Sequence, residues 1–151
     1  MLSDVERKML RNLQQEGRIT NQELAARCAM SPSACLERMR RLTERGYIRG
    51  YAALLDPQKL NRAFLVFVEV ILDRTTGDVF RLFSESVARR PEIMECHMVA
   101  GGFDYLLKLR TEDMTSYRSF LVDVLAELPG IRETRTYAVM EEVKSSTAIP
   151  F

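Results

Sequence analysis

The chain has 151 residues, which is room for one ordinary domain or two small ones. Hydrophobic residues make up 46% and charged residues 28% of it, which excludes a disordered chain. The longest apolar run, residues 64–68, is far shorter than the ~20 residues that a transmembrane helix needs. The N-terminus lacks the pattern of a signal peptide, and three cysteines cannot all pair within one chain. We therefore expect a reduced, cytoplasmic protein.

The net charge of +1 conceals two halves of opposite sign. Residues 1–60 hold 11 Lys and Arg against 7 Asp and Glu, for a net charge of +4. Residues 61–151 hold the other 11 basic residues and 14 acidic ones, for a net charge of −3. This asymmetry favours a basic module that contacts a polyanion and a second module with another task. Chance is the alternative explanation, because charge balance by itself is only a prior.

Three short helices are predicted in the basic half. Each follows a hydroxyl side chain in N-cap position, at Ser3, Thr20 and Ser31, and the first two have a glutamate three residues later, as in a capping box. Pro32 suits the first position of the third helix, and Gly17 and Gly46 suit helix ends. The residues that we expect to be buried are, helix by helix, Val5, Met9, Leu10 and Leu13; Leu24, Ala25 and Cys28; and Cys35, Leu36, Met39 and Leu42.

The third helix is predicted to read double-stranded DNA. Short helices joined by a tight connection fit a helix-turn-helix, whose second helix enters the major groove. Small polar side chains in its first turn can approach base edges, while arginines can bind guanine or phosphates. The residues expected to contact DNA are Thr20, Asn21, Ser31, Ser33, Ala34, Arg38, Arg41 and Arg45. The alternative is a solvated helix face, because Glu37 and Arg41 form a favourable i,i+4 pair.

The segment after the third helix is predicted to form a strand pair or wing over residues 47–55, and Asp56-Pro57 then breaks the pattern. We expect a DNA-binding domain over residues 1–50, a linker strand over 51–61 and a second domain over 62–151.

The acidic half is predicted to follow the order strand, helix, strand, strand, helix, strand. The expected elements are a strand at 64–72, a helix from Asp78 that stops at Pro91, strands at 93–100 and from Tyr105, a helix at about 114–128 and a strand at 131–139. This order predicts an α+β chain, with a winged helix-turn-helix followed by a ferredoxin-like βαββαβ domain. One face of its sheet, carrying Leu65, Phe67, Ile71 and Val99 or their neighbours, has nothing left to cover it, which implies a second copy.

Residues 2–18 and 31–48 resemble the opening helix and the recognition-helix signature of the Lrp/AsnC (feast/famine) transcriptional regulators. The turn at residues 101–107, Gly-Gly-Phe-Asp-Tyr-Leu-Leu, is similar to the Gly-(Asp/Glu)-(Tyr/Phe)-Asp turn of that family's ligand-binding (RAM) domain, and residues 65–72 and 134–144 also resemble it. The resemblance thus covers essentially the whole chain. Two departures stand out: Gly102 occupies a position that is usually acidic, and almost no chain precedes the first helix to form a basic arm.

The resemblance implies a transcriptional regulator of amino-acid metabolism whose assembly or DNA binding responds to an amino acid, with leucine as the leading candidate. The effector would bind between dimers near the glycine turn, in a homodimer that assembles to a tetramer or octamer. Glycine N–H groups suit a carboxylate and Asp104 suits an α-ammonium; the alternative role for Asp104 is to cap the turn between the strands. The residues expected at the effector site are Met98, Ala100, Gly101, Gly102, Phe103, Asp104, Tyr105, Thr136, Tyr137 and Ala138.

Other chemistries are not indicated by the sequence. Cys28, Cys35, Cys96 and His97 lack the spacing of a zinc site, and the one histidine has no nucleophile that would make it catalytic. The Gly101-Gly102 pair lacks the Lys-Ser/Thr of a phosphate-binding loop. We expect no enzyme, no metal, no membrane partner and no cofactor besides the effector. Two alternatives stay open: an architectural, nucleoid-type DNA-binding protein without an effector, and a ferredoxin-like enzyme with a basic helical appendage.

Overall fold

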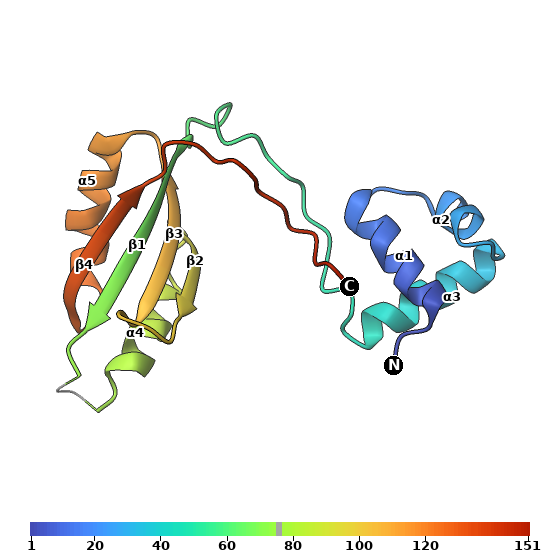
Figure 1. Cartoon of the computed structure of the whole chain (residues 1–151), viewed down its shortest axis with the longest axis horizontal. Helices are drawn as coiled ribbons and strands as arrows, with labels where there is room; N and C mark the ends of the chain where they lie inside the picture. The colour runs from blue at the N-terminus through green and yellow to red at the C-terminus, as the bar shows by residue number, and fades with distance from the viewer. Residues whose placement is uncertain (75–76) are drawn as a thin grey trace. The chain divides into compact units, whose positions relative to one another are not determined.

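Three helices form the N-terminal part of the computed structural model, which describes residues 1–74 and 77–151 (Figure 1). They are α1 (Asp4–Gln15), α2 (Asn21–Arg27) and α3 (Pro32–Glu44). Each begins as predicted, because the hydroxyls of Ser3, Thr20 and Ser31 each accept a hydrogen bond from the N–H three residues further on. Their core consists of Met9, Leu24, Ala25, Cys28, Cys35 and Leu42.

Two expectations about burial in these helices are wrong. Leu36 is 62% exposed and Val5 is 37% exposed, whereas Cys35 and Leu42 are fully buried. Successive residues of a helix are rotated by ~100°, so Leu36 lies beside the buried stripe of α3 rather than in it. No helix of this unit covers that flank.

The strand pair expected over residues 47–55 does not form in the described chain, where this stretch has no regular secondary structure. The N–H groups of Tyr47 and Ile48 both donate to the carbonyl of Leu42 at the end of α3. The stretch beyond them finds no backbone partner, and a β-strand forms only where a second segment completes its hydrogen bonds.

A four-stranded antiparallel sheet forms the second part, with strand order β2-β3-β1-β4. The strands are β1 (Phe64–Leu72), β2 (Ile93–Met98), β3 (Tyr105–Thr111) and β4 (Ile131–Ala138); α4 (Val79–Val87) links β1 to β2, and α5 (Met114–Asp123) with the short 3-10 helix η1 (Leu125–Glu127) links β3 to β4. This order confirms the predicted βαββαβ arrangement. The helix predicted to reach residue 128 ends early, and β2 stops before Ala100.

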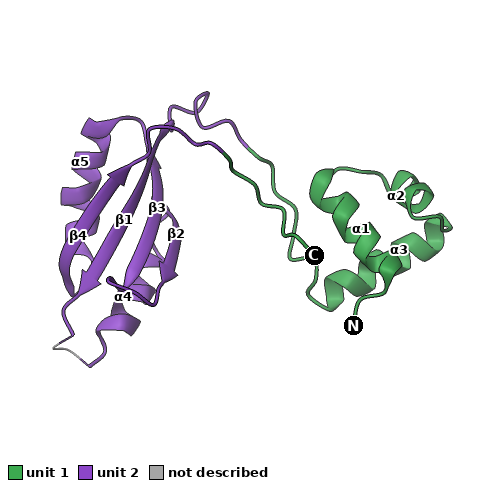
Figure 2. Cartoon of the chain, viewed as in Figure 1, with its two compact units in different colours: residues 1–54, 144–151 green, residues 55–143 purple. Residues whose placement is uncertain are grey.

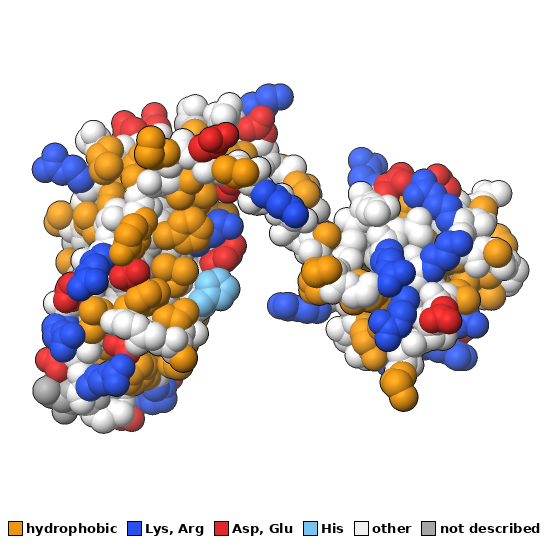
Figure 3. Space-filling view, in the orientation of Figure 1, with side chains coloured by type: hydrophobic (Ala, Val, Ile, Leu, Met, Phe, Trp, Pro, Cys, Tyr) orange, Lys and Arg blue, Asp and Glu red, His pale blue; other side chains and the backbone are white. Residues whose placement is uncertain are grey.

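One face of the sheet packs on the helices and the other is open. Val66, Val68 and Val70 of β1 are fully buried with Phe83 of α4 and Tyr117 of α5. The alternate residues of the central strands face the opposite way: Phe67 is paired with Lys108, and Glu69 with Leu106. Figure 3 shows hydrophobic side chains interspersed with charged ones over this unit. Of the residues expected on the bare face, Phe67, Ile71 and Val99 are half-buried, whereas Leu65 is 5% exposed.

The chain divides into two compact units, residues 1–54 with 144–151 and residues 55–143 (Figure 2). The C-terminal residues join the helical unit because α1 holds them. The Gln14 side chain accepts from the N–H of Ile149 at 2.6 Å and donates to its carbonyl at 3.1 Å, and Arg11 donates to the Phe151 carbonyl oxygen at 2.6 Å. The division thus differs from the expected one, in which the second domain kept residues 62–151.

Candidate DNA-binding and effector sites

Three of the residues expected to contact DNA also hold the helix-turn-helix together. Thr20 Oγ1 accepts from the N–H of Glu23 at 3.2 Å, and Ser31 Oγ accepts from the N–H of Ala34 at 3.3 Å. The Asn21 side-chain amide donates to the carbonyl of Pro32 at 2.8 Å, which fixes the start of α2 against the start of α3. The Thr20 hydroxyl acts as an acceptor here, and the Ser31 hydroxyl also lies 3.2 Å from Ser33 Oγ, where either oxygen can donate.

Two of the expected arginines lie on the flank of α3 that faces α1. Arg45 approaches Glu6 at 3.4 Å, and its guanidinium lies 4.9 Å from the centre of the Tyr47 ring. The pKa of the Glu6 carboxyl is lowered first by its hydrogen bonds from Ser3 and then by the charges of Arg45 and Arg38. Arg38 is half-buried. Glu6 therefore offsets part of the positive charge on this flank.

The solvent-exposed face of α3, next to this flank, carries an ion-pair network. Glu37 accepts from Arg40 at 2.8 Å and from Arg41 at 2.9 Å, and Arg40 also pairs with Glu44. Hydrogen bonds from the two arginines lower the pKa of Glu37 to about 2. Arg40 is not among the residues predicted to contact DNA, but its side chain is 58% exposed, close to the 63% of Arg41. The Glu37–Arg41 pair on which the alternative of a solvated helix face was based is present, and Arg40 extends it.

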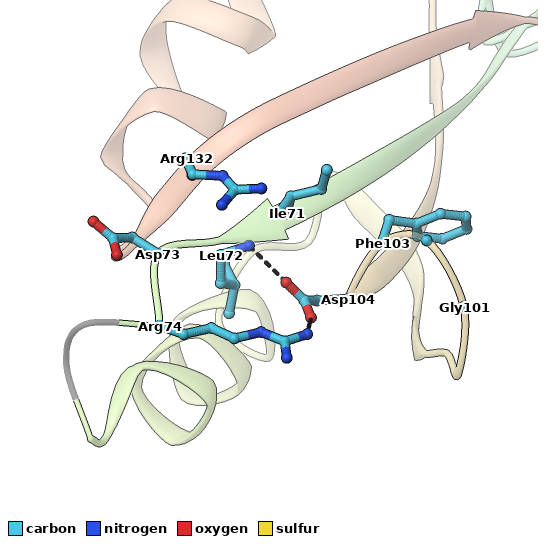
Figure 4. A pocket seen from close by; sticks show the side chains of 9 residues that line it. Ile71, Leu72, Asp73, Arg74, Gly101, Phe103, Asp104 and Arg132 are labelled. Atoms are coloured by element: carbon cyan, nitrogen blue, oxygen red, sulfur yellow. Dashed lines mark hydrogen bonds and ion pairs between the residues drawn. The ribbon is translucent and has the colours of Figure 1, made fainter.

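The glycine turn forms part of an open pocket of about 580 Å³ at the end of β1 (Figure 4). The turn residues expected at the effector site come together here with a segment that the sequence did not single out. The pocket is lined by Ile71, Leu72, Asp73, Arg74, Gly101, Gly102, Phe103, Asp104 and Arg132. Only the pairing of β1 with its two neighbours brings these parts of the chain to the same edge of the sheet.

Asp104 ties the turn to β1. Its side chain is 4% exposed, accepts from the N–H of Leu72 at 2.8 Å and pairs with Arg74, while its own N–H donates to Val70. The Leu72 N–H is the main cause that lowers the pKa of the Asp104 carboxyl, and Arg74 lowers it further. The carboxylate therefore has a structural task at the pocket wall, as the turn-capping alternative anticipated.

The pocket nevertheless presents free polar groups. Within residues 1–74 and 77–151, Arg132 forms no hydrogen bond or ion pair, and the N–H groups of Gly101 and Gly102 have no acceptor. Figure 4 shows the Arg132 side chain extending over the end of β1 beside Ile71. A guanidinium and free N–H groups suit a carboxylate. A Cβ at Gly102 would meet no atom within 4 Å, so the missing acidic residue is not excluded by lack of space.

The expected effector residues of β4 lie elsewhere in the same chain. Thr136, Tyr137 and Ala138 pair with Val68, Phe67 and Val66. They therefore begin four residues beyond Arg132 along the strand, or ~13 Å at the rise of a β-strand. The Thr136 hydroxyl bonds to that of Tyr117.

The remaining expected effector residues flank the turn without lining the pocket. Tyr105 is buried, with its hydroxyl 3.1 Å from Ser84 Oγ, and Met98 is 63% exposed at the end of β2. Ala100 is exposed between them. One chain thus gathers Gly101–Asp104 but not the whole expected set.

Metal-binding and membrane-spanning features are not found among the described residues. No group of three or more His, Cys, Asp or Glu there is arranged to hold a metal ion, and no described helix is long and apolar enough to cross a membrane. Burial raises the pKa of the Cys28 and Cys35 thiols, so both behave as core residues.

Comparison with known proteins matches both units. Residues 2–49 fit a winged helix-turn-helix DNA-binding model, and residues 65–149 fit the Lrp/AsnC ligand binding domain. The leucine-responsive regulatory proteins of Escherichia coli (strain K12) and Klebsiella pneumoniae are 51% identical over 148 residues, which cover 98% of this chain and 90% of theirs.

Solved structures show the same architecture. A transcriptional regulator of Neisseria meningitidis in complex with L-Met has a TM-score of 0.94 at 36% identity, and an AsnC family regulator of Agrobacterium tumefaciens has 0.93 at 32%. Each match covers 99% of this chain and 97% of the other. The chain belongs to the Lrp/AsnC family and is a DNA-binding transcriptional regulator with an amino-acid-binding domain.

Proposed function

We propose that this regulator controls genes of amino-acid metabolism and that an apolar amino acid changes its assembly or its affinity for DNA. Leucine is the first candidate for this effector. The observation that carries the proposal is the pocket at the glycine turn, where Arg132 and the N–H groups of Gly101 and Gly102 can bind an anion. The same chain holds a helix-turn-helix. Leucine is favoured because the relatives that are 51% identical are leucine-responsive regulatory proteins. Methionine is the second candidate, since a structural relative is a complex with L-Met.

The exposed side of α3 supplies the DNA contacts in this proposal. Ser33, Ala34 and Arg41 are exposed, and among the described residues Glu37 is the one ion-pair partner of Arg41. An exposed ion pair is worth no more than ~1 kcal/mol, so a DNA phosphate can replace Glu37 as the partner of Arg41. Thr20, Asn21 and Ser31 would add hydroxyl and amide contacts from the helix starts, and Arg38 and Arg45 would contact the backbone from the flank.

The effector would bind with its carboxylate on Arg132 and the Gly101 and Gly102 N–H groups. Asp104 would position the turn, and Phe103 and Ile71 would contact the aliphatic side chain. The residues of β4 at 136–138, together with Met98, Ala100 and Tyr105, would complete the site from a second copy. A homodimer that assembles further, to a tetramer or octamer, follows from that sharing. No metal or other cofactor enters the proposal, and we place the protein in the cytoplasm, at the nucleoid.

One pair of measurements on the full chain tests this function. Sedimentation gives the mass, and fluorescence anisotropy gives the affinity for a duplex selected from random DNA, each with and without leucine or methionine. We expect leucine to change one of the two, and Arg132→Gln to weaken the leucine response about tenfold or more. Arg118→Gln, an exposed arginine of α5, is the matched control. DNA binding without a response to any amino acid would favour the architectural alternative.

A further inference from the structure

Leu36 is an exposed large hydrophobic residue of α3. It lies in the second turn of that helix and is 62% exposed, whereas its neighbour Cys35 is fully buried. Residues three and four apart share a face of a helix, so Leu36 lies in line with Ser33 before it and Arg40 after it. Both of these are exposed. We call these three residues the Leu36 stripe.

The Leu36 stripe is separate from the flank that faces α1. Arg38 and Arg45 act on Glu6 of α1, and relative to Leu36 they are rotated by about 200° and 180° around the helix axis. The stripe thus presents a hydroxyl, an apolar side chain and a guanidinium in succession, with no other helix over them. The N-terminal turns of a recognition helix are the part that reaches base edges in the major groove.

The surroundings of Leu36 fit DNA better than an apolar protein surface. Arg40 of the stripe and its neighbour Arg41 are both exposed on α3. An apolar partner would have to desolvate these charges, whereas a polyanion takes their place in the ion pairs with Glu37 and Glu44. The apolar group that the major groove offers is the C5-methyl group of thymine.

We propose that Leu36 is a specificity-determining residue that packs against a thymine methyl group in the operator, between the contacts of Ser33 and Arg40. This inference rests on the proposed binding of specific DNA through α3. In this arrangement Arg40 contacts base edges, and the half-buried Arg38 contacts the DNA backbone. The contact requires no rearrangement of the core, because the side chain is already in solvent.

The test removes the methyl group from the DNA and the apolar side chain from the protein. The full chain first selects its preferred duplex from a random pool, and each thymine of that duplex is then replaced by deoxyuridine. For the wild type, we expect one position per half-site at which loss of the methyl weakens binding about fourfold, the worth of one buried methyl group. Leu36→Ala should bind thymine and uracil equally at that position and keep the wild-type response elsewhere.

Val122→Ala is the control, since Val122 is a 70% exposed apolar residue of α5, and it should keep the full thymine dependence. An unchanged response of Leu36→Ala at every position overturns the inference and leaves DNA binding intact. The inference is also overturned if Leu36→Ala keeps the thymine dependence but has a smaller mass in solution, because Leu36 would then contact another copy of the chain. A wild type that enriches no sequence overturns the proposed function, and this inference with it.

Discussion

Replacing Asp104 with alanine should loosen the end of β1 at the pocket. Leu72 is 1% exposed and its N–H donates to the Asp104 carboxylate, so the alanine variant leaves a buried donor without an acceptor. That loss costs about 1–3 kcal/mol of unfolding free energy. The Arg74 side chain is 71% exposed, so its pair with Asp104 adds at most ~1 kcal/mol. Asp104→Asn keeps an acceptor for Leu72 and should cost less than ~1 kcal/mol.

Hydrogen exchange of a peptide covering residues 64–74, followed by mass spectrometry, reports the local opening of β1, and urea unfolding reports the global effect. The carboxyl pKa is lowered in the folded chain, so its contribution is fully present above the unfolded pKa of ~3.9 and is lost as the pH falls through the folded value. The stability difference between the wild type and Asp104→Asn should therefore shrink below pH ~3.9. Equal exchange in the alanine and asparagine variants would refute this account of the turn.

Three further predictions concern the helices, the turn before β4 and the phosphate contacts. Gly130→Ala should lower the unfolding free energy by about 2–4 kcal/mol, because Gly130 has a φ of 74° and a Cβ there would lie 2.1 Å from Val79 Cγ2. Gly46 has a φ of 75° but open space around it, so Gly46→Ala should lower the unfolding free energy by only the ~1–2 kcal/mol of backbone strain. Equal losses of unfolding free energy in urea for the two variants would contradict this. Ser31→Ala should cost about 0.5–2 kcal/mol through its lost N-cap, seen as a lower Tm, whereas Ser33→Ala, which keeps the cap, should not. Arg41→Gln should reduce the slope of log affinity against log salt by ~0.9, and a slope that stays at the wild-type value would place Arg41 away from phosphates.

Short-range signals in the chain predict where the helices begin and where β1 lies. Hydroxyl caps at Ser3, Thr20 and Ser31 fix where the helices begin, since each satisfies an N–H within its own first turn. Strand β1 has the predicted bounds because eight of its nine residues are apolar, the exception being Glu69. These are interactions between residues a few positions apart, and their signals are readable in the chain.

Which side chains are exposed depends on packing between segments that are far apart in the chain. The apolar pattern placed Leu36 in the core, but its burial depends on whether another element covers that flank of α3, and none in its unit does. Asp104 has its partners about 30 residues away, Gln14 holds Ile149 across 135 residues, and Arg132 reaches the pocket only through the pairing of β4 with β1. Such contacts follow from strand order and register, to which each residue's local pattern contributes almost nothing. The sequence therefore predicts a site at the glycine turn, while the packing of distant segments decides which side chains surround that turn.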